Sequence, residues 1–496
     1  MTTATPNALR ISLSRPLRWY DYITTNIFFL GLTTVAQANG LIFPLLIERY
    51  VGEAGKATFF GNLRLWTLMV ALLVQSAMGM ISDRSASSWG RRRPFILAGT
   101  VFSLVFMVAL GYATGLEGMK GYWFLFATAI LLSVSSNTSQ AAEQGLIPDL
   151  VPEEKRGRFS GVKAILELPL PLLLVSFTVA NLVSKGNMWA GIIVAMVALA
   201  LTMLVTLFVP ERSMNTKGEP LDWAPFLRLA LMTALFTAII LGVGQIVRRA
   251  GVYVQTFRSV PAMLIMMGAL GLIGMVATVA MGVWLSVRLS LGKTSVQRPG
   301  FTWWVINRLA YLVGAVNLST FAVFFIQARL GYIHEKAAKP AAVLMLVVGV
   351  FILVAALPSG WLADRFGHKR LVAVSGITAA IGTLIALSLP SLPVIYVGGC
   401  ILGAATGIFY TANWALGTDL VPKREAARYL GISNLAGAGA GAVGAYIGGP
   451  IADFFTLHVP QLPGIGYVLL FGIYGTLFLL SVVALSRVRV PLQAPA

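Results

Sequence analysis

The chain has 496 residues, of which 57% are hydrophobic and only 11% charged, and its mean hydropathy is +0.82. Soluble domains carry roughly a quarter charged residues, so this composition excludes an ordinary soluble protein and predicts many membrane spans of about 20 residues each. The net charge of +19 does not indicate nucleic-acid binding, because the basic residues lie in short loops between apolar runs, where they orient the spans and contact anionic lipid.

Apolar runs in the first part of the chain predict six membrane-spanning helices. Arg10, Arg15 and Arg18 precede the first run, and basic residues beside a span favour the cytoplasmic side. That run is too long for the apolar region of a signal peptide and no cleavage site follows it, so we expect no cleaved leader. The predicted spans cover residues 22–48, 57–82, 94–114, 122–147, 161–184 and 186–210.

Eight more apolar runs follow a polar linker at 211–222. A loop motif that recurs from Gly360 onward marks the run that ends there as the second span of a second half. Two earlier runs are then left over as an inserted hairpin, with Arg248, Arg249 and Arg258 at its tip. The predicted spans are 226–247 and 259–288 for the hairpin, then 301–327, 341–362, 370–389, 393–419, 427–452 and 464–486.

The run count predicts an all-α protein of about fourteen membrane helices, with both termini in the cytoplasm and many passes through the cell membrane. It divides the chain into an N-terminal six-helix half at 1–210, a linker and hairpin at 211–298, and a C-terminal six-helix half at 299–496. The hairpin tip falls outside the cell on this count, against the tendency of basic residues to stay inside.

Two loops repeat the pattern G-x-x-x-D-R followed by a second glycine and two or three basic residues. Each lies after the second predicted span of its half. A second repeat, D-L-V-P, begins at Asp149 and at Asp419, in each case two spans after the first motif. The chain is therefore a doubled membrane protein. The residues of the first motif are Gly79, Asp83, Arg84, Gly90, Arg91 and Arg92 in one copy and Gly360, Asp364, Arg365, Gly367 and Arg370 in the other.

This motif resembles the signature of the major facilitator superfamily of transporters. The longer first copy, S-D-R-x5-G-R-R-R-P-F-I, resembles the branch of proton-coupled sucrose and glycoside symporters. The resemblance implies two halves around a central site near mid-bilayer. It also implies alternating-access transport of a small polar solute, a sugar or glycoside, in symport with protons, by a monomer in the lipid bilayer that is not an enzyme.

The resemblance further implies that the loop motifs control conformational switching. Asp83 with Arg84, Arg91 and Arg92 would close the inner face by pairing with charges and a helix N-terminus of the opposite half. The second copy, with Asp364, Arg365 and Arg370, would do so more weakly.

Polar side chains recur at helical spacing on four predicted spans, which the resemblance places around the central cavity. A neutral, amide-rich lining suits a hydroxyl-rich uncharged solute better than a strong anion or cation. Interhelical hydrogen bonding is an alternative that the spacing leaves open. The candidate substrate-binding residues are Asn26, Thr33, Gln37, Asn137, Gln140, Tyr311, Asn317, Tyr410 and Asn413.

Charged residues inside spans cost about 2.5–3.5 kcal/mol near the bilayer centre, so each one needs a reason. Glu167 is a candidate for proton coupling because two prolines after it leave backbone carbonyls free; the alternative is an ion pair with Lys163. Glu143, near the inner boundary of its span, is a second candidate, with a gate or a salt bridge to a loop arginine as its role. For Arg64 and Arg308 we expect snorkelling or an interhelical pair.

Other chemistry is not predicted. Cys400 is the only cysteine and the three histidines are scattered, so we expect no disulfide framework, metal site or cofactor. Residues 292–294 resemble the end of a P-loop but lack its first glycine, which excludes ATP-driven transport.

Two other functions stay open beside symport. One is a fourteen-span drug–proton antiporter, although residues 162–171 contain no glycine where such antiporters carry a glycine-rich run. The other is a non-transporting receptor or pigment-delivery protein on the same scaffold.

Overall fold

The computed structural model describes residues 18–209, 211, 222–257, 259–291, 299–421 and 426–488. Within these ranges the chain is helical and contains no strand. Helices are expected from the long apolar runs because, in lipid, every backbone polar group must be bonded inside its own segment. Several sequence predictions lie outside the described residues, namely those on Arg10, Arg15, Arg258, most of the linker and residues 292–294.

The first half consists of helices that follow the predicted spans closely. The fifth span is broken where the prolines predict it, since α6 ends at Glu167 and α7 begins at Pro169. The elements are α1 (Asp21–Thr24), α2 (Ile27–Val51), α3 (Lys56–Asp83), α4 (Arg93–Ala113), α5 (Gly118–Leu150), η1 (Glu153–Lys155), α6 (Arg156–Glu167), α7 (Pro169–Leu174), the π-helical turn η2 (Val175–Val179), α8 (Ala180–Ser184) and α9 (Met188–Thr206).

The middle of the chain forms the expected pair of long helices, α10 (Ala224–Val254) and α11 (Val260–Leu291). α10 extends beyond its predicted end, so Arg248 and Arg249 lie within the helix rather than at the tip. The guanidinium of Arg248 lies 5.1 Å from the ring centroid of Tyr446, and an aromatic face is a favourable neighbour for a cation in a membrane protein.

The second half repeats the arrangement of the first. Its first span bends by 58° between α13 and α14. The elements are α13 (Pro299–Thr320), α14 (Ala322–Leu330), η3 (His334–Ala337), α15 (Ala338–Phe366), α16 (His368–Ser388), α17 (Leu392–Leu420), α18 (Ala426–His458) and α19 (Ile465–Ser486).

Twelve helices of the described part are long and apolar enough to cross a membrane, and the bent pair α13–α14 would be a thirteenth span. α18 is 33 residues long, and part of it lies outside the residues on which this count rests. The all-α membrane fold is confirmed. The count of about fourteen spans stays a prediction.

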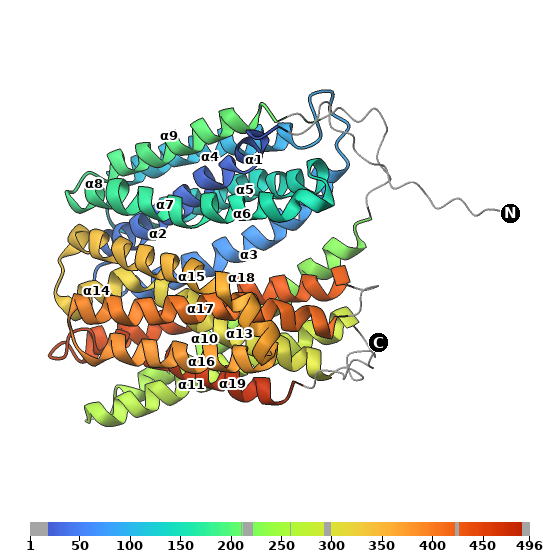
Figure 1. Cartoon of the computed structure of the whole chain (residues 1–496). Helices are drawn as coiled ribbons and strands as arrows, with labels where there is room; N and C mark the ends of the chain where they lie inside the picture. The colour runs from blue at the N-terminus through green and yellow to red at the C-terminus, as the bar shows by residue number, and fades with distance from the viewer. Residues whose placement is uncertain are drawn as a thin grey trace.

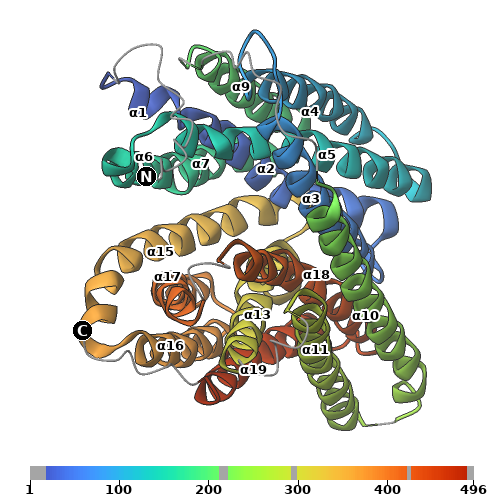
Figure 2. The ribbon, with the colours of Figure 1, turned by 90° about the vertical axis from the view of Figure 1, so that its right-hand side faces the viewer.

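The two halves lie side by side with their helices running in similar directions (Figure 1). They meet where α3 packs on α18 and where α7 and α8 pack on α15. α10 runs beside α3 and α18, and α11 packs on α13, α18 and α19 (Figure 2).

Glycines bring α3 and α18 into backbone contact. A Cβ atom at Gly61 would collide with the carbonyl oxygen of Ala445, and one at Gly449 would collide with that of Ala57. The closest approach of the halves therefore lies near the start of α3, at the end of the molecule opposite the loop motifs.

Candidate functional site

A cavity of about 360 Å³ lies between the halves. α2 and α3 contribute to its wall from one half, and α13, α15 and α17 contribute from the other. Apolar side chains such as Phe60, Leu172 and Met345 make up most of the wall. Its polar members are Gln37, Arg64, Ser319, Thr320, Thr406 and Tyr410.

Two of the nine predicted binding residues, Gln37 and Tyr410, line this cavity. Thr33, Asn137 and Gln140 are half-buried but do not belong to its wall. The amide of Asn137 donates instead to the carbonyl of Ser133, one turn earlier in α5, at 2.8 Å.

The remaining four predicted residues are fully buried. Asn26 lies in the first half, and Tyr311, Asn317 and Asn413 lie in the second. Asn26 donates to the carbonyl of Phe159 at 3.3 Å, and Asn317 donates to that of Ala440 at 3.0 Å. In this conformation both side-chain amides donate hydrogen bonds to a carbonyl of another helix. This is the alternative that their spacing left open.

Tyr311 and Asn413 also join helices of the second half. The hydroxyl of Tyr311 donates to Thr406 Oγ1 at 3.4 Å. The side chain of Asn413 donates to Asn307 Oδ1 at 2.9 Å and accepts from Arg308 Nη1 at 3.0 Å. Arg308 therefore has the interhelical partner that we expected, although this partner is an amide and not a carboxylate.

Glu167 and Glu143 differ in their surroundings. Glu167 Oε2 lies 3.6 Å from Lys163 Nζ, and its side chain is 38% exposed. Glu143 is fully buried in α5, and neither of its carboxylate oxygens has a hydrogen-bond partner in the described part of the chain. Neither residue lines the cavity, although Leu168, next to Glu167, does.

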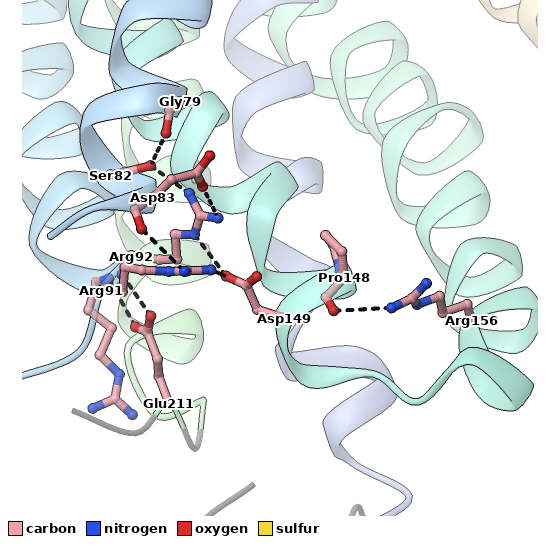
Figure 3. Close-up of polar contacts among 10 residues, drawn as sticks. Gly79, Ser82, Asp83, Arg91, Arg92, Pro148, Asp149, Arg156 and Glu211 are labelled. Atoms are coloured by element: carbon pink, nitrogen blue, oxygen red, sulfur yellow. Dashed lines mark hydrogen bonds and ion pairs between the residues drawn. The ribbon is translucent and has the colours of Figure 1, made fainter. Parts of the chain in front are cut away.

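The first loop motif forms an ionic network around Arg92 (Figure 3). Arg92 Nε donates to Asp149 Oδ2 at 2.9 Å, its Nη1 donates to Ser82 Oγ at 2.6 Å, and its Nη2 pairs with Asp83. Arg91 pairs with the same Asp149 and donates to the backbone carbonyl of Asp83 at 3.2 Å. The two repeated motifs, G-x-x-x-D-R and D-L-V-P, therefore meet in space.

Glu211 binds the backbone of the same arginine-rich loop. It accepts from the backbone N–H of Arg92 at 2.7 Å and of Arg93 at 3.2 Å, which occupies free donors at the start of α4. Burial raises the pKa of Glu211, and these N–H groups oppose the rise. Gly90 has φ +118° and a Cβ there would collide with Glu211, so only glycine fits.

Among the residues that the structure describes, all the contacts of this network lie within the N-terminal half and the first linker residue, Glu211. Ser82 Oγ donates to the carbonyl of Gly79 at 3.1 Å, and Arg84 directly follows α3. The described residues of the opposite half form no hydrogen bond or ion pair with the motif in this conformation, so its role as a lock stays a prediction.

The second motif copy places a histidine where the first has Arg91. His368 Nδ1 lies 2.8 Å from Asp419 Oδ2 and its Nε2 lies 3.7 Å from Asp364. Gly367, with φ +89°, joins α15 to α16. A Cβ atom at Gly360 would meet open space, and the guanidinium of Arg365 lies 5.4 Å from the ring centroid of Trp361. Arg370 is exposed.

The opposite end of the molecule carries a network that the sequence analysis did not predict. Lys56 Nζ lies 3.2 Å from Glu48 Oε1 and 3.0 Å from Gln327 Oε1, and Gln327 Nε2 donates to Glu48 Oε2 at 2.7 Å. Glu48 and Lys56 belong to the first half and Gln327 to the second, and all three are buried. This cross-half network closes that end.

Further bonds between the halves surround this network. Asp453 of α18 accepts from the backbone N–H of Ala57 at 3.1 Å and of Thr58 at 2.7 Å, at the positive N-terminus of α3. Arg49 pairs with Glu335 at 2.9 Å. Sequence reasoning missed these residues because they lie at the ends of different spans and share no motif.

Two family models match the two halves of the chain. The model described as Major Facilitator Superfamily matches residues 309–496, and the model described as MFS/sugar transport protein matches residues 54–229. Each range contains one copy of the loop motif. The chain belongs to the major facilitator superfamily.

Parts of this superfamily member are similar to curated sugar transporters. The minor myo-inositol transporter IolF of Bacillus subtilis is 36% identical over 90 residues, which are 18% of this chain and 20% of that protein. The general alpha-glucoside permease of Schizosaccharomyces pombe is 26% identical over 194 residues, 34% of this chain and 35% of the permease. The sucrose transport protein SUC3 of Arabidopsis thaliana is 24% identical over 224 residues, 37% of this chain and 36% of that protein. The chain therefore matches about a fifth to a third of these relatives' length.

Solved structures of the superfamily share the fold over nearly the whole chain. A D-xylose–proton symporter has a TM-score of 0.61 at 14% identity and covers 95% of this chain and 98% of its own. A peptide transporter POT in complex with sulfate has a TM-score of 0.65 at 14% identity and covers 96% of each. These proteins are membrane transporters and not enzymes.

Proposed function

We propose that this protein is a secondary active transporter that moves a sugar or glycoside across a membrane by alternating access, in symport with protons. The observation that carries the proposal is the cavity between the halves, lined from both and closed at one end by the network of Glu48, Lys56 and Gln327. A site at the interface of two repeats is the arrangement that alternating access requires.

The contrast between the two ends of the molecule supports this mechanism. At one end, bonds such as that from Thr58 N to Asp453 cross between the halves. At the loop-motif end, Arg91 and Arg92 bind Asp149 of their own half. Rocking the halves would break the first set and free the loop motif to pair across the interface. With its arginine-rich loops, the loop-motif end is the cytoplasmic one in this proposal.

Sugar as the solute class rests on the relatives and on the cavity wall. The three curated relatives are named as transporters of myo-inositol, alpha-glucosides and sucrose. The hydroxyl and amide groups of Gln37, Ser319, Thr320 and Tyr410 suit a hydroxyl-rich solute.

Uptake into vesicles tests the proposal directly. The purified full chain is reconstituted, a pH gradient is imposed, and accumulation of labelled sucrose, maltose, myo-inositol and methyl glucosides is followed. We expect gradient-dependent accumulation of at least one of them. Binding without uptake would indicate a receptor instead, and gradient-driven export of hydrophobic drugs would indicate an antiporter.

A further inference from the structure

Arg64 of α3 is the one charged side chain among the described residues that line the cavity. It lies at the seam of the two halves, because α3 packs on α18. A Cβ atom at Gly441 of α18 would lie 4.0 Å from Nη2 of Arg64, which places the guanidinium beside the backbone of that helix. We expected Arg64 to snorkel or to form an interhelical pair, and in the structure it lies at the cavity wall.

The guanidinium of Arg64 has no partner in the part of the chain that the structure describes. No hydrogen bond or ion pair joins it to a described residue, and its Nε is buried and unbonded. Lys56 and Arg92 are paired with Glu48 and Asp149, whereas Arg248, whose Nε is also unbonded, lies over the ring of Tyr446. Arg64 is thus a half-buried base with a buried Nε and no counter-charge among the described residues.

An unpaired guanidinium at this depth is costly. Arginine stays protonated in proteins, and a buried charge without a partner loses solvation that nothing repays. An anion that entered the cavity would supply the missing partner, and a carboxylate matches the guanidinium fork with two parallel hydrogen bonds.

The rest of the wall favours an anion that also carries hydroxyl groups. Among the described residues that line the cavity, none is an aspartate or glutamate that would repel it. Arg308 donates to Asn413, which follows the cavity residue Tyr410 by three residues in α17, and adds a second positive charge to this region. Ser319, Thr320 and Thr406 offer hydroxyls beside these charges.

We propose that the solute is a sugar acid, a hexuronate or a glycoside of one, whose carboxylate binds Arg64 while its hydroxyls bind the polar wall. This inference rests on the proposed sugar transport and narrows its substrate class. It revises the expectation of an uncharged solute. That expectation was based only on the neutral polar side chains at helical spacing on four predicted spans.

A matched pair of ligands tests the proposal. Methyl glucuronide and methyl glucoside differ only at C6, where one has a carboxylate and the other a hydroxymethyl group. Binding of each to the purified full chain is measured by calorimetry, with acetate and phosphate as simple anions. We expect the acid to bind at least roughly tenfold tighter than its neutral twin, as one charge-assisted contact predicts.

Variants locate the effect at Arg64. Arg64→Gln should remove most of the preference for the acid and change binding of the neutral glucoside by less than roughly threefold, whereas Arg64→Lys should keep part of the preference. Arg248→Gln is the matched control: it removes a similarly buried arginine that lies over Tyr446, outside the cavity wall, and should leave the acid-to-neutral ratio unchanged.

Binding of the two glycosides to the wild-type protein tests the sugar-acid proposal even if a variant does not fold. Equal binding of the two glycosides, or binding of acetate or phosphate as tight as that of the glucuronide, would overturn the sugar-acid proposal. Accumulation of neutral glycosides without binding of the acid would overturn it and leave sugar transport standing. The absence of uptake for every neutral and acidic sugar would refute the proposed function itself.

Discussion

Glu167 is the residue at which we place proton coupling. It ends α6 beside the cavity residue Leu168, and a partly exposed carboxylate can exchange protons with water there. Its partner Lys163 precedes it by four residues, which is the weaker order for a helical ion pair. We expect Glu167→Gln to abolish accumulation driven by a pH gradient and to leave solute exchange across vesicles intact. Undiminished accumulation would remove Glu167 from the mechanism.

Glu143 presents a different problem, since its carboxylate is buried without a hydrogen-bond partner in the described chain. A charged carboxylate in this setting is costly, and glutamine keeps the shape without the charge. We expect Glu143→Gln to raise the free energy of unfolding by about 1 kcal/mol, measured by thermal unfolding in detergent. A lowered midpoint would mean that the carboxylate is stabilised in the folded protein.

At the scale of elements, the loop motif joins α3, α4 and α5 through two carboxylates with different surroundings. The side chain of Asp83 is 55% exposed, whereas that of Asp149 is 15% exposed and receives both arginines. We expect Asp83→Asn to slow transport roughly tenfold, equivalent to about 1.4 kcal/mol in the barrier, while solute binding and stability persist.

Asp149→Asn is the companion variant. It leaves two arginines without their shared carboxylate and should cost about 3 kcal/mol of stability, as expected for a broken buried pair. Transport rates, binding constants and unfolding midpoints of both variants are compared with wild type. Parallel loss of binding and transport in Asp83→Asn, at normal protein level, would contradict the switching role.

The seam between α3 and α18 depends on the missing side chain of Gly449. A methyl group there would collide with the carbonyl oxygen of Ala57, so the helices must separate. We expect Gly449→Ala to lower stability by about 1–3 kcal/mol, as overpacking does. Gly472→Ala in α19 is the control, because a Cβ atom there meets open space. Equal unfolding midpoints for the two variants would show that the close approach contributes nothing.

For the whole molecule, alternating access requires that the end closed by the cross-half network opens during each cycle. Arg49 and Glu335 pair across it, and Cys400 is the only native cysteine to replace. In a Cys400→Ser background, Arg49→Cys with Glu335→Cys should become inactive when a short cleavable dithiol cross-linker joins them. A reducing agent should restore uptake.

Single-cysteine variants treated in the same way are the control for this experiment. The cross-linked protein should still bind solute, because the cavity lies away from the linked pair. Full uptake by the cross-linked double variant would mean that this end does not open in transport.

The sequence by itself determined the helices, their doubling and the family. Long apolar runs can satisfy their backbone in lipid only as helices, the D-R and D-L-V-P loops recur in both halves, and the prolines after Glu167 predicted the break between α6 and α7.

Only the tertiary structure decided which polar side chains meet. Helical spacing assigns a residue to a face but not to a neighbour, so Asn26 and Asn317 looked like cavity residues and are buried interhelical bonds. Lys56 and Gln327 are 271 residues apart in the chain. No local sequence pattern predicts that together they close one end of the molecule.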